Sequence, residues 1–440
     1  MKILRLLTLI PLMLALCGAL PASAQSLIDL YQSAKAFDAG YQAARSLFDA
    51  SLAKGEQARA ALLPSAHLAW GMNRTHISSD TAAFDRGNYG NQSATLMASQ
   101  PIYRPANLAI ARQGSKQVEL AQAQLQAAEQ DLMVRVSQAY FDVLAAQDSL
   151  NLVKSQKEAV AEQLASAKRN FEVGTSTITD TREAQARFDL VLAQDIAADN
   201  DVRIKILVLD QLTGKSQSTP KPLKFPVILP AITGDVTTWL SPSDSIHPLI
   251  RQARIGLEMA QLETQKAQAG NKPTLDLTGS YNITHNNGSA ITTLDYRSNV
   301  TSIGLNLNWP LFAGFSIQNR IKETLALEEK SRSDLDAARR GVALATRSAF
   351  LGVQSGLSQV QALEAAQASS QSALAATQLG YSVGVRINID VLNSQSLMFD
   401  TKTKLAKARY DVLLGTLKLR FADGSLQEDD LKTINTLLAL

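Results

Sequence analysis

Two aspartates occupy equivalent positions in two near-copies of one motif. The segment Phe171–Gly174 is followed six residues later by Asp180, and the segment Tyr381–Gly384 is followed six residues later by Asp390. Both motifs interrupt long helical patterns, so the glycines suit the positive φ of a helix end and the aspartates suit capping of the next helix. A carboxylate in such a turn can also accept charge-assisted hydrogen bonds from a phenol or a guanidinium. The sequence therefore supplies polar groups that can tie helices together.

Residues for covalent or metal chemistry do not form any recognisable pattern. The four histidines have no metal-ligand spacing, and the single cysteine, Cys17, lies in the amino-terminal apolar run. Neither a glycine-rich phosphate loop nor a Ser/His/Asp arrangement with supporting context occurs. We therefore expect no enzymatic activity, no cofactor and no metal site.

The amino terminus has the pattern of a secretory signal peptide spanning residues 1–24. Lys2 and Arg5 precede a leucine-rich run, and Ala22–Ala24 forms a small-residue cleavage site. A lipoprotein signal is disfavoured because a leucine, and not a small residue, precedes the cysteine. After the signal, no segment has about 18 consecutive apolar residues, so we expect no transmembrane helix.

The charge balance excludes one class of partner. The chain has 43 Lys and Arg against 40 Asp and Glu, a formal charge of +3. This small value offers no electrostatic argument for binding nucleic acid, so we expect none.

Helical periodicity dominates the rest of the chain. Apolar residues recur every three or four positions from Leu125 to Val153, as in a coiled-coil seam. At 1.5 Å per residue the longest predicted helix is on the order of 100 Å long. Such helices must pack side by side as an extended bundle or a hollow barrel. The predicted long helices are about Asn107–Phe171, Asp180–Leu212, Gln318–Ser382 and Asp390–Phe421.

Two pairs of short segments have a period of two instead. Apolar residues alternate with polar ones, which is typical of membrane β-strands with one face toward lipid and one toward a lumen. Polar loops at Thr75–Asn91 and Thr284–Asn299 separate the strands of each pair. The alternating apolar positions are Leu68, Trp70, Met72, Ala94, Leu96, Ala98, Leu275, Leu277, Tyr281, Ile283, Ile303, Leu305, Leu307 and Trp309.

These elements occur once in each half of the chain, with an offset of about 210 residues. We expect a first structural repeat at residues 25–214 and a second at 243–421, each with one strand pair and one long helical hairpin. Residues 215–242 contain five prolines and form the predicted linker. Residues 422–440 form a short C-terminal tail. A closed membrane barrel needs at least about eight strands, so four strands per chain predict an oligomer.

The signal peptide, the paired hairpins and the twin Val-Gly turns resemble the TolC family of outer-membrane channel proteins, over essentially the whole mature chain. The most specific stretch is Gly380–Asn393. The resemblance implies a mainly α fold with a membrane β part. Three chains with four strands each would form a twelve-stranded β-barrel, which a long periplasmic α-helical barrel continues.

Function and partners follow from the same resemblance. Family members are exit ducts in the outer membrane for type I protein secretion or multidrug efflux. They are homotrimers, in contact with outer-membrane lipid. They dock onto a periplasmic adaptor (membrane fusion protein), which links them to an inner-membrane ABC or proton-driven transporter. The run from Asp390 to Asn393 resembles type I secretion members somewhat more.

Roles for individual residues are also implied by the resemblance. The turns would contact the adaptor through Val173, Gly174, Val383 and Gly384. A periplasmic gate would join Thr179 and Asp180 to Tyr381 and Arg386. Three copies of Asp390 would form an acidic pore ring, and Asn393 stands where some relatives have a second acid, so we expect weaker blockage by cations. The alternatives are that the aspartates are only helix caps and that Arg386 is a solvated surface charge.

One alternative from another class is a soluble periplasmic coiled-coil adaptor or scaffold. It would explain the signal peptide and the long helices. It would not explain the alternating strand pairs that end near Tyr103 and Trp309.

Overall fold

The computed structural model describes residues 24–78, 80, 87–224, 226–232, 234–288 and 294–439. The predicted signal peptide lies outside the described residues except for Ala24, and so do parts of both predicted hairpin loops. Within the described chain, no helix is both long and apolar enough to cross a membrane. The chain divides into two units, which we treat separately. The sheet unit comprises Arg45–Leu125 and Pro248–Arg340, and the helical unit comprises Met1–Ala44, Gln126–His247 and Gly341–Leu440.

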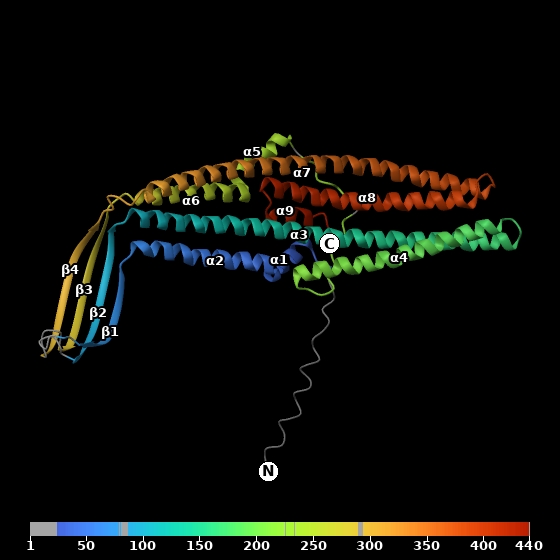
Figure 1. The fold of residues 1–440 in the computed structure, drawn as a ribbon. Coiled ribbons are helices and arrows are strands. Elements are labelled where there is room, and N and C mark those ends of the chain that lie inside the picture. Colours follow the sequence, from blue (N-terminus) through green and yellow to red (C-terminus); the bar gives the residue numbers. More distant parts are fainter. Residues whose placement is uncertain are drawn as a thin grey trace, which may run out of the picture. The chain divides into compact units, whose positions relative to one another are not determined.

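The sheet unit contains four antiparallel strands in the order β1-β2-β3-β4 (Figure 1). They are β1 Ser65–Ile77, β2 Gly87–Tyr103, β3 Thr274–Asn287 and β4 Asp295–Asn308. Both predicted strand pairs are present, but the strands extend into the predicted loops. Backbone pairing does not depend on apolar side chains, and polar residues at these ends pair across the ladder. Asn91, for example, donates its side-chain amide to Asn286.

The two faces of this sheet differ in polarity. Directly paired residues share a face, so the ladder sets Leu68, Leu96 and Tyr281 side by side. The opposite face carries polar pairs, and Thr95 Oγ1 donates to Asn282 Oδ1 at 3.2 Å. The predicted alternation is therefore confirmed. Further apolar-face residues are Trp70, Met72, Leu277, Ile303, Leu305 and Leu307.

Helices of the sheet unit approach one another closely at two glycines. The unit includes η1 Ala60–Leu62, helices α2 Ala39–Arg59 (from Arg45) and α6 Pro248–Ala269, and the first parts of α3 Pro105–Glu172 and α7 Ser316–Ser382. A Cβ placed on Gly114 would lie 2.5 Å from Ala58 Cβ and 3.3 Å from the Gly55 carbonyl oxygen. No ordinary contact is that short, so α2 and α3 need a glycine here.

An ion pair ties the start of α3 to the sheet. Arg104 donates to both carboxylate oxygens of Asp276, at 2.7 and 2.6 Å. This bidentate geometry fixes the direction in which the chain leaves β2.

Long hairpins make up most of the helical unit. α4 Ile178–Thr213 lies along the last part of α3, and α8 Asn388–Asp423 lies along the last part of α7 (Figure 1). The four long helices thus start and end within two residues of their predicted limits. Shorter helices are α1 Leu27–Phe37, α5 Val236–Ile246 and α9 Glu428–Asn435.

The predicted linker is more ordered than its prolines indicated. α5 starts at Val236, inside the segment 215–242, and contains Pro242. Short β-bridges join Gln25 to Pro220 and Leu223 to Leu438, so the linker pairs with segments that are far from it in the sequence. The units also combine segments from both halves, so the predicted repeats are not separate domains in space. Their boundaries stay a prediction.

The contact at Gly114 predicts a stability effect with a matched control. Gly114→Ala should destabilise the purified protein by about 1–3 kcal/mol, because the added methyl forces two helices apart. Gly256→Ala on α6 meets nothing within 4 Å, so removal of a helix-interior glycine should stabilise by up to about 1 kcal/mol. Thermal unfolding followed by circular dichroism measures both. Equal shifts for the two variants would contradict the packing account.

Candidate functional site

Both long hairpins of the helical unit turn through the same helix-ending motif. Gly174 and Gly384 have φ of 79° and 82°. The Gly174 N–H donates to Phe171 O and the Thr175 N–H to Asn170 O, and the second hairpin repeats this from Gly384 and Val385. This is a Schellman motif. A Cβ on either glycine would meet nothing within 4 Å, so the backbone angle, and not lack of space, requires glycine.

The helices that follow the two turns start differently. α4 has Thr177 as its N-cap, and Thr177 Oγ1 accepts from the Asp180 N–H at 3.2 Å while Asp180 Oδ2 accepts from the Thr177 N–H at 3.0 Å. Asp180 is thus the third helical residue of a capping box and not the N-cap we expected, because the helix starts two residues earlier. α8 follows Ile387, which makes no side-chain cap. Asp390 therefore caps nothing with its side chain.

Asp180 is held in its charged form. Burial disfavours the carboxylate, but hydrogen bonds from the Thr177 N–H and from the Ser176 and Thr177 hydroxyls outweigh burial and lower its pKa. All of these donors bind Oδ2. Oδ1 has no hydrogen-bond partner within the described chain, so it can accept a hydrogen bond from another molecule.

Inside one chain, most of the side chains that join the two hairpins lie outside the predicted gate set; of that set, Tyr381 takes part by accepting from Asn170. Asn388, which is almost fully buried, accepts from Gln163 and donates to Asp180 O at 3.4 Å. Arg187 donates to Asn393 Oδ1 at 2.8 Å. Beneath them, Leu392 of the second hairpin packs in one apolar cluster with α3 and α4 residues Val160, Leu164, Ala167, Ala184 and Val191.

Asn388, Gln163 and Arg187 were not predicted from the sequence. No local signal in the sequence marks Asn388, because its burial and its partners are known only from the fold. Asn393, which we considered only as a pore residue, is in this chain a contact between hairpins.

The predicted gate residues do not meet one another within the described chain. Tyr381 Oη accepts from Asn170 Nδ2 at 3.3 Å, which leaves its O–H free to donate. The Arg386 guanidinium lies 3.7 Å from Asp390 of its own chain and is mostly exposed. Thr179 is exposed as well. Donors and acceptors are therefore present on the surface, without their predicted partners.

The turns also present apolar side chains to solvent. Val173 and Val383, the predicted docking residues, are 72% and 65% exposed, and Val385 and Ile387 are exposed beside them. Exposed valines this dense at a helix end indicate a surface that contacts another molecule.

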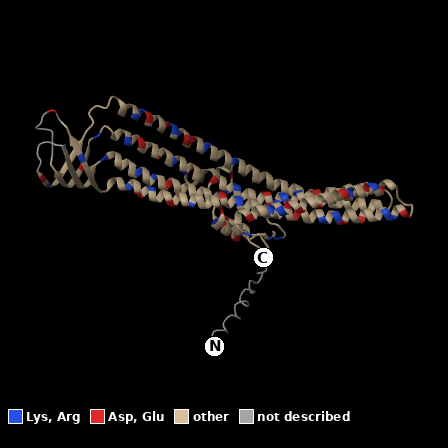
Figure 2. Cartoon of the chain, turned by 60° about the horizontal axis from the view of Figure 1, so that its bottom comes forward, with Lys and Arg blue, Asp and Glu red and all other residues tan. Residues whose placement is uncertain are grey.

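The four strands are almost free of charge. Their charged residues are Arg74, Asp276, Asp295 and Arg297. Asp276 is the third residue of β3, at the helix-connected end of the sheet, and the other three lie toward the hairpin end. Figure 2 shows the sheet almost free of the blue and red that mark charged residues along the helices. An apolar face over about ten uncharged residues per strand is the pattern of a membrane-spanning sheet.

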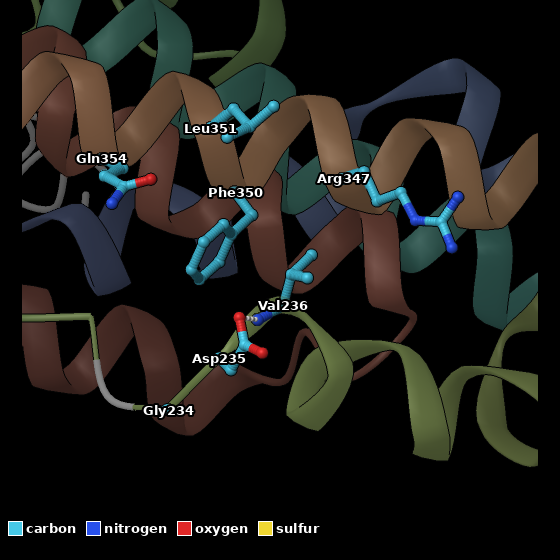
Figure 3. A pocket seen from close by; sticks show the side chains of 7 residues that line it. All are labelled: Gly234, Asp235, Val236, Arg347, Phe350, Leu351 and Gln354. Atoms are coloured by element: carbon cyan, nitrogen blue, oxygen red, sulfur yellow. Dashed lines mark hydrogen bonds between the residues drawn. The ribbon is translucent and has the colours of Figure 1, made fainter.

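A hollow of about 590 Å³ lies between the start of α5 and α7 (Figure 3). Only Asp235 and Arg347 among its lining residues carry charge. Asp235 Oδ1 accepts from the Val236 N–H at 2.7 Å and so caps its own helix. The described lining therefore offers no pair of groups for acid–base chemistry.

Known proteins have sequences and a fold similar to those of this chain. The chain is similar to the outer membrane protein TolC of Vibrio cholerae, with 33% identity over 414 residues that cover 94% of this chain and 93% of the relative. It is also similar to the alkaline protease secretion protein AprF of Pseudomonas aeruginosa, with 31% identity over 94% of this chain and 87% of the relative. The crystal structure of the outer membrane protein VceC from Vibrio cholerae has the same fold, with a TM-score of 0.77, 17% identity and coverage of 90% and 96%.

These similarities favour the outer-membrane channel over the soluble coiled-coil scaffold, the two functions that the sequence left open. A coiled-coil scaffold has no place for the four-stranded sheet, whereas channels of the TolC type contain one. Family members are channels and not enzymes. The protein is thus an outer-membrane exit duct with a periplasmic extension, for type I secretion or efflux. The sequence profile described as "Outer membrane efflux protein" matches residues 30–215 and 240–425, and the chain belongs to this family.

Proposed function

We propose that three copies of the chain pool their strands into one twelve-stranded barrel that opens into a helical tunnel. The observation that carries this proposal is the sheet itself, which has an apolar face, an uncharged middle and two unpaired edges, at β1 and β4. Unpaired backbone groups cannot face lipid, so the edges of neighbouring chains must pair. Substrate then passes through the lumen along the polar face, without covalent change.

The turns would form the periplasmic mouth and its gate. Asp180 Oδ1, the Tyr381 O–H and the Arg386 guanidinium are all available on the surface of one chain. We infer that Tyr381 and Arg386 donate to Thr179 and Asp180 of the neighbouring copy. Such charge-assisted hydrogen bonds can hold the mouth closed. Because they are few, a partner that binds the open state better can break them.

That partner would be a periplasmic adaptor joined to an ABC or proton-driven transporter. The exposed apolar turns support this role, because an adaptor hairpin can bury Val173 and Val383 beside Gly174 and Gly384. AprF is named for secretion of alkaline protease. This relative favours protein export, and not drug efflux, as the function of the channel.

The gate is tested by Arg386→Ser in planar lipid bilayers. Loss of the guanidinium removes a closing bond, so single-channel conductance should rise several-fold over that of the wild type. Arg203→Ser is the matched control, since Arg203 also has an aspartate four residues away, at 2.7 Å, but lies far from the turns in sequence. Unchanged conductance in the Arg386 variant, or an equal rise in both, would remove Arg386 from the gate.

The pore ring is tested by Asp390→Asn. Three carboxylates at the narrowest point favour cations, so the variant should lose most of the cation preference in reversal-potential measurements under a salt gradient. Asn393→Asp should have the opposite effect, with tighter blockage by divalent cations. A cation preference that is the same in all three proteins would rule out the ring.

A further inference from the structure

The hairpin end of the sheet carries a basic cluster on its apolar face. The ladder places Met72, Gln92, His285 and Arg297 in one row across the four strands. Arg74 lies two residues farther along β1, on the same face. Toward the helices, the preceding row on that face contains Trp70, Ala94 and Ile283, with Asn299 as its member on β4. Cationic and amide groups therefore stand directly beside apolar ones.

These rows surround a hollow of about 310 Å³, lined among others by Trp70, Gln92, Ile283, His285 and Arg297. His285 Nε2 lies 3.4 Å from Asp295 Oδ1, so the carboxylate of this cluster has a partner already. Arg74 and Arg297 are exposed, and in the part of the sheet that the structure describes neither guanidinium has an ion-pair partner. Among the described residues, the two arginines of the site therefore have no counter-ion, because Asp295 pairs with His285.

The depth of the cluster follows from strand geometry. Twelve residues separate Arg297 from Trp309, which corresponds to about 41 Å along a strand. A tilt of about 40° reduces this to about 31 Å along the membrane normal, close to the roughly 30 Å thickness of a hydrocarbon core. With Trp309 at one interface, Arg297 lies at the headgroup level of the other. The helices are periplasmic and join the opposite end of the sheet, so the cluster faces the outer leaflet.

We propose that Arg297, with His285, Gln92 and Arg74, binds the phosphate of a phosphorylated lipid in the outer leaflet, while Trp70 and Ile283 contact its acyl chains. This proposal rests on the membrane placement of the sheet given under the proposed function. A guanidinium binds phosphate in bidentate fashion, and the neighbouring apolar row matches the other half of such a lipid. An unpaired arginine on a lipid-facing surface is unfavourable unless it reaches a headgroup. Basic pockets at membrane surfaces bind lipid phosphates in this way.

The test uses the purified full-length protein in detergent and native mass spectrometry. The probes are diphosphorylated lipid A and the same lipid after removal of both phosphates. The wild type should retain the phosphorylated form about tenfold more tightly. Arg297→Gln should lower that affinity about tenfold, in line with loss of one charge-assisted contact, and adding Arg74→Gln should lower it further. Lys322→Gln, an exposed cation on α7 of the same unit, should change nothing.

Three results would overturn the proposal. The first is equal retention of both lipids by the wild type, and the second is unaltered retention of the phosphorylated lipid by the double variant. The third is displacement of the lipid by the same concentration of inorganic phosphate, because the site would then be one for free phosphate. Conductance of the same preparations in planar bilayers separates the two claims. A preparation that conducts but does not prefer the phosphorylated lipid refutes the lipid site alone. A preparation that does not conduct refutes the proposed function.

Discussion

The backbone of an unpaired strand cannot be exposed to lipid, and most of the structure depends on this constraint. Each chain contributes four strands, with β1 and β4 at the edges, and one apolar face. A lone copy would leave two rows of amide and carbonyl groups unsatisfied, each group at a cost of several kcal/mol. Association of chains is therefore a condition of membrane insertion. Each strand is joined to a helical segment at one end, so chains that pair their strands also bring these segments together.

At the two hairpin turns, backbone geometry determines where the neighbouring side chains lie. Two Schellman turns close the hairpins chiefly through backbone hydrogen bonds, and the side chains of Val173, Thr179, Val383 and Arg386 are exposed beside them. Contacts inside the chain use other residues, chiefly Asn388 and the apolar cluster around Leu392. This division matters for a gate. Bonds inside a chain keep each pair of hairpins together, while bonds between chains can break without unfolding either partner.

Long-period patterns in the sequence predicted the fold well. The apolar spacing from Leu125 to Val153 predicted a helix with one packed side, and the alternation from Leu275 to Ile283 predicted a strand. Both patterns arise because one side of each element packs against apolar surroundings. Strand ends and α5 were harder to predict, since the ladder continues through Asn91 and Asn286 and a helix accommodates Pro242. The contacts of Asn388 lie 208 and 225 residues away, beyond any local pattern. The basic row on the sheet appears only once strand register is known.

The number of chains in the particle is best measured by native mass spectrometry of the detergent-solubilised protein, because pooled strands require a fixed number of chains. We expect a particle with the mass of three chains, and that same particle should conduct ions in a planar bilayer. A stable particle of one or two chains, without conductance, would contradict the account, since four or eight strands from such chains cannot make the twelve-stranded duct.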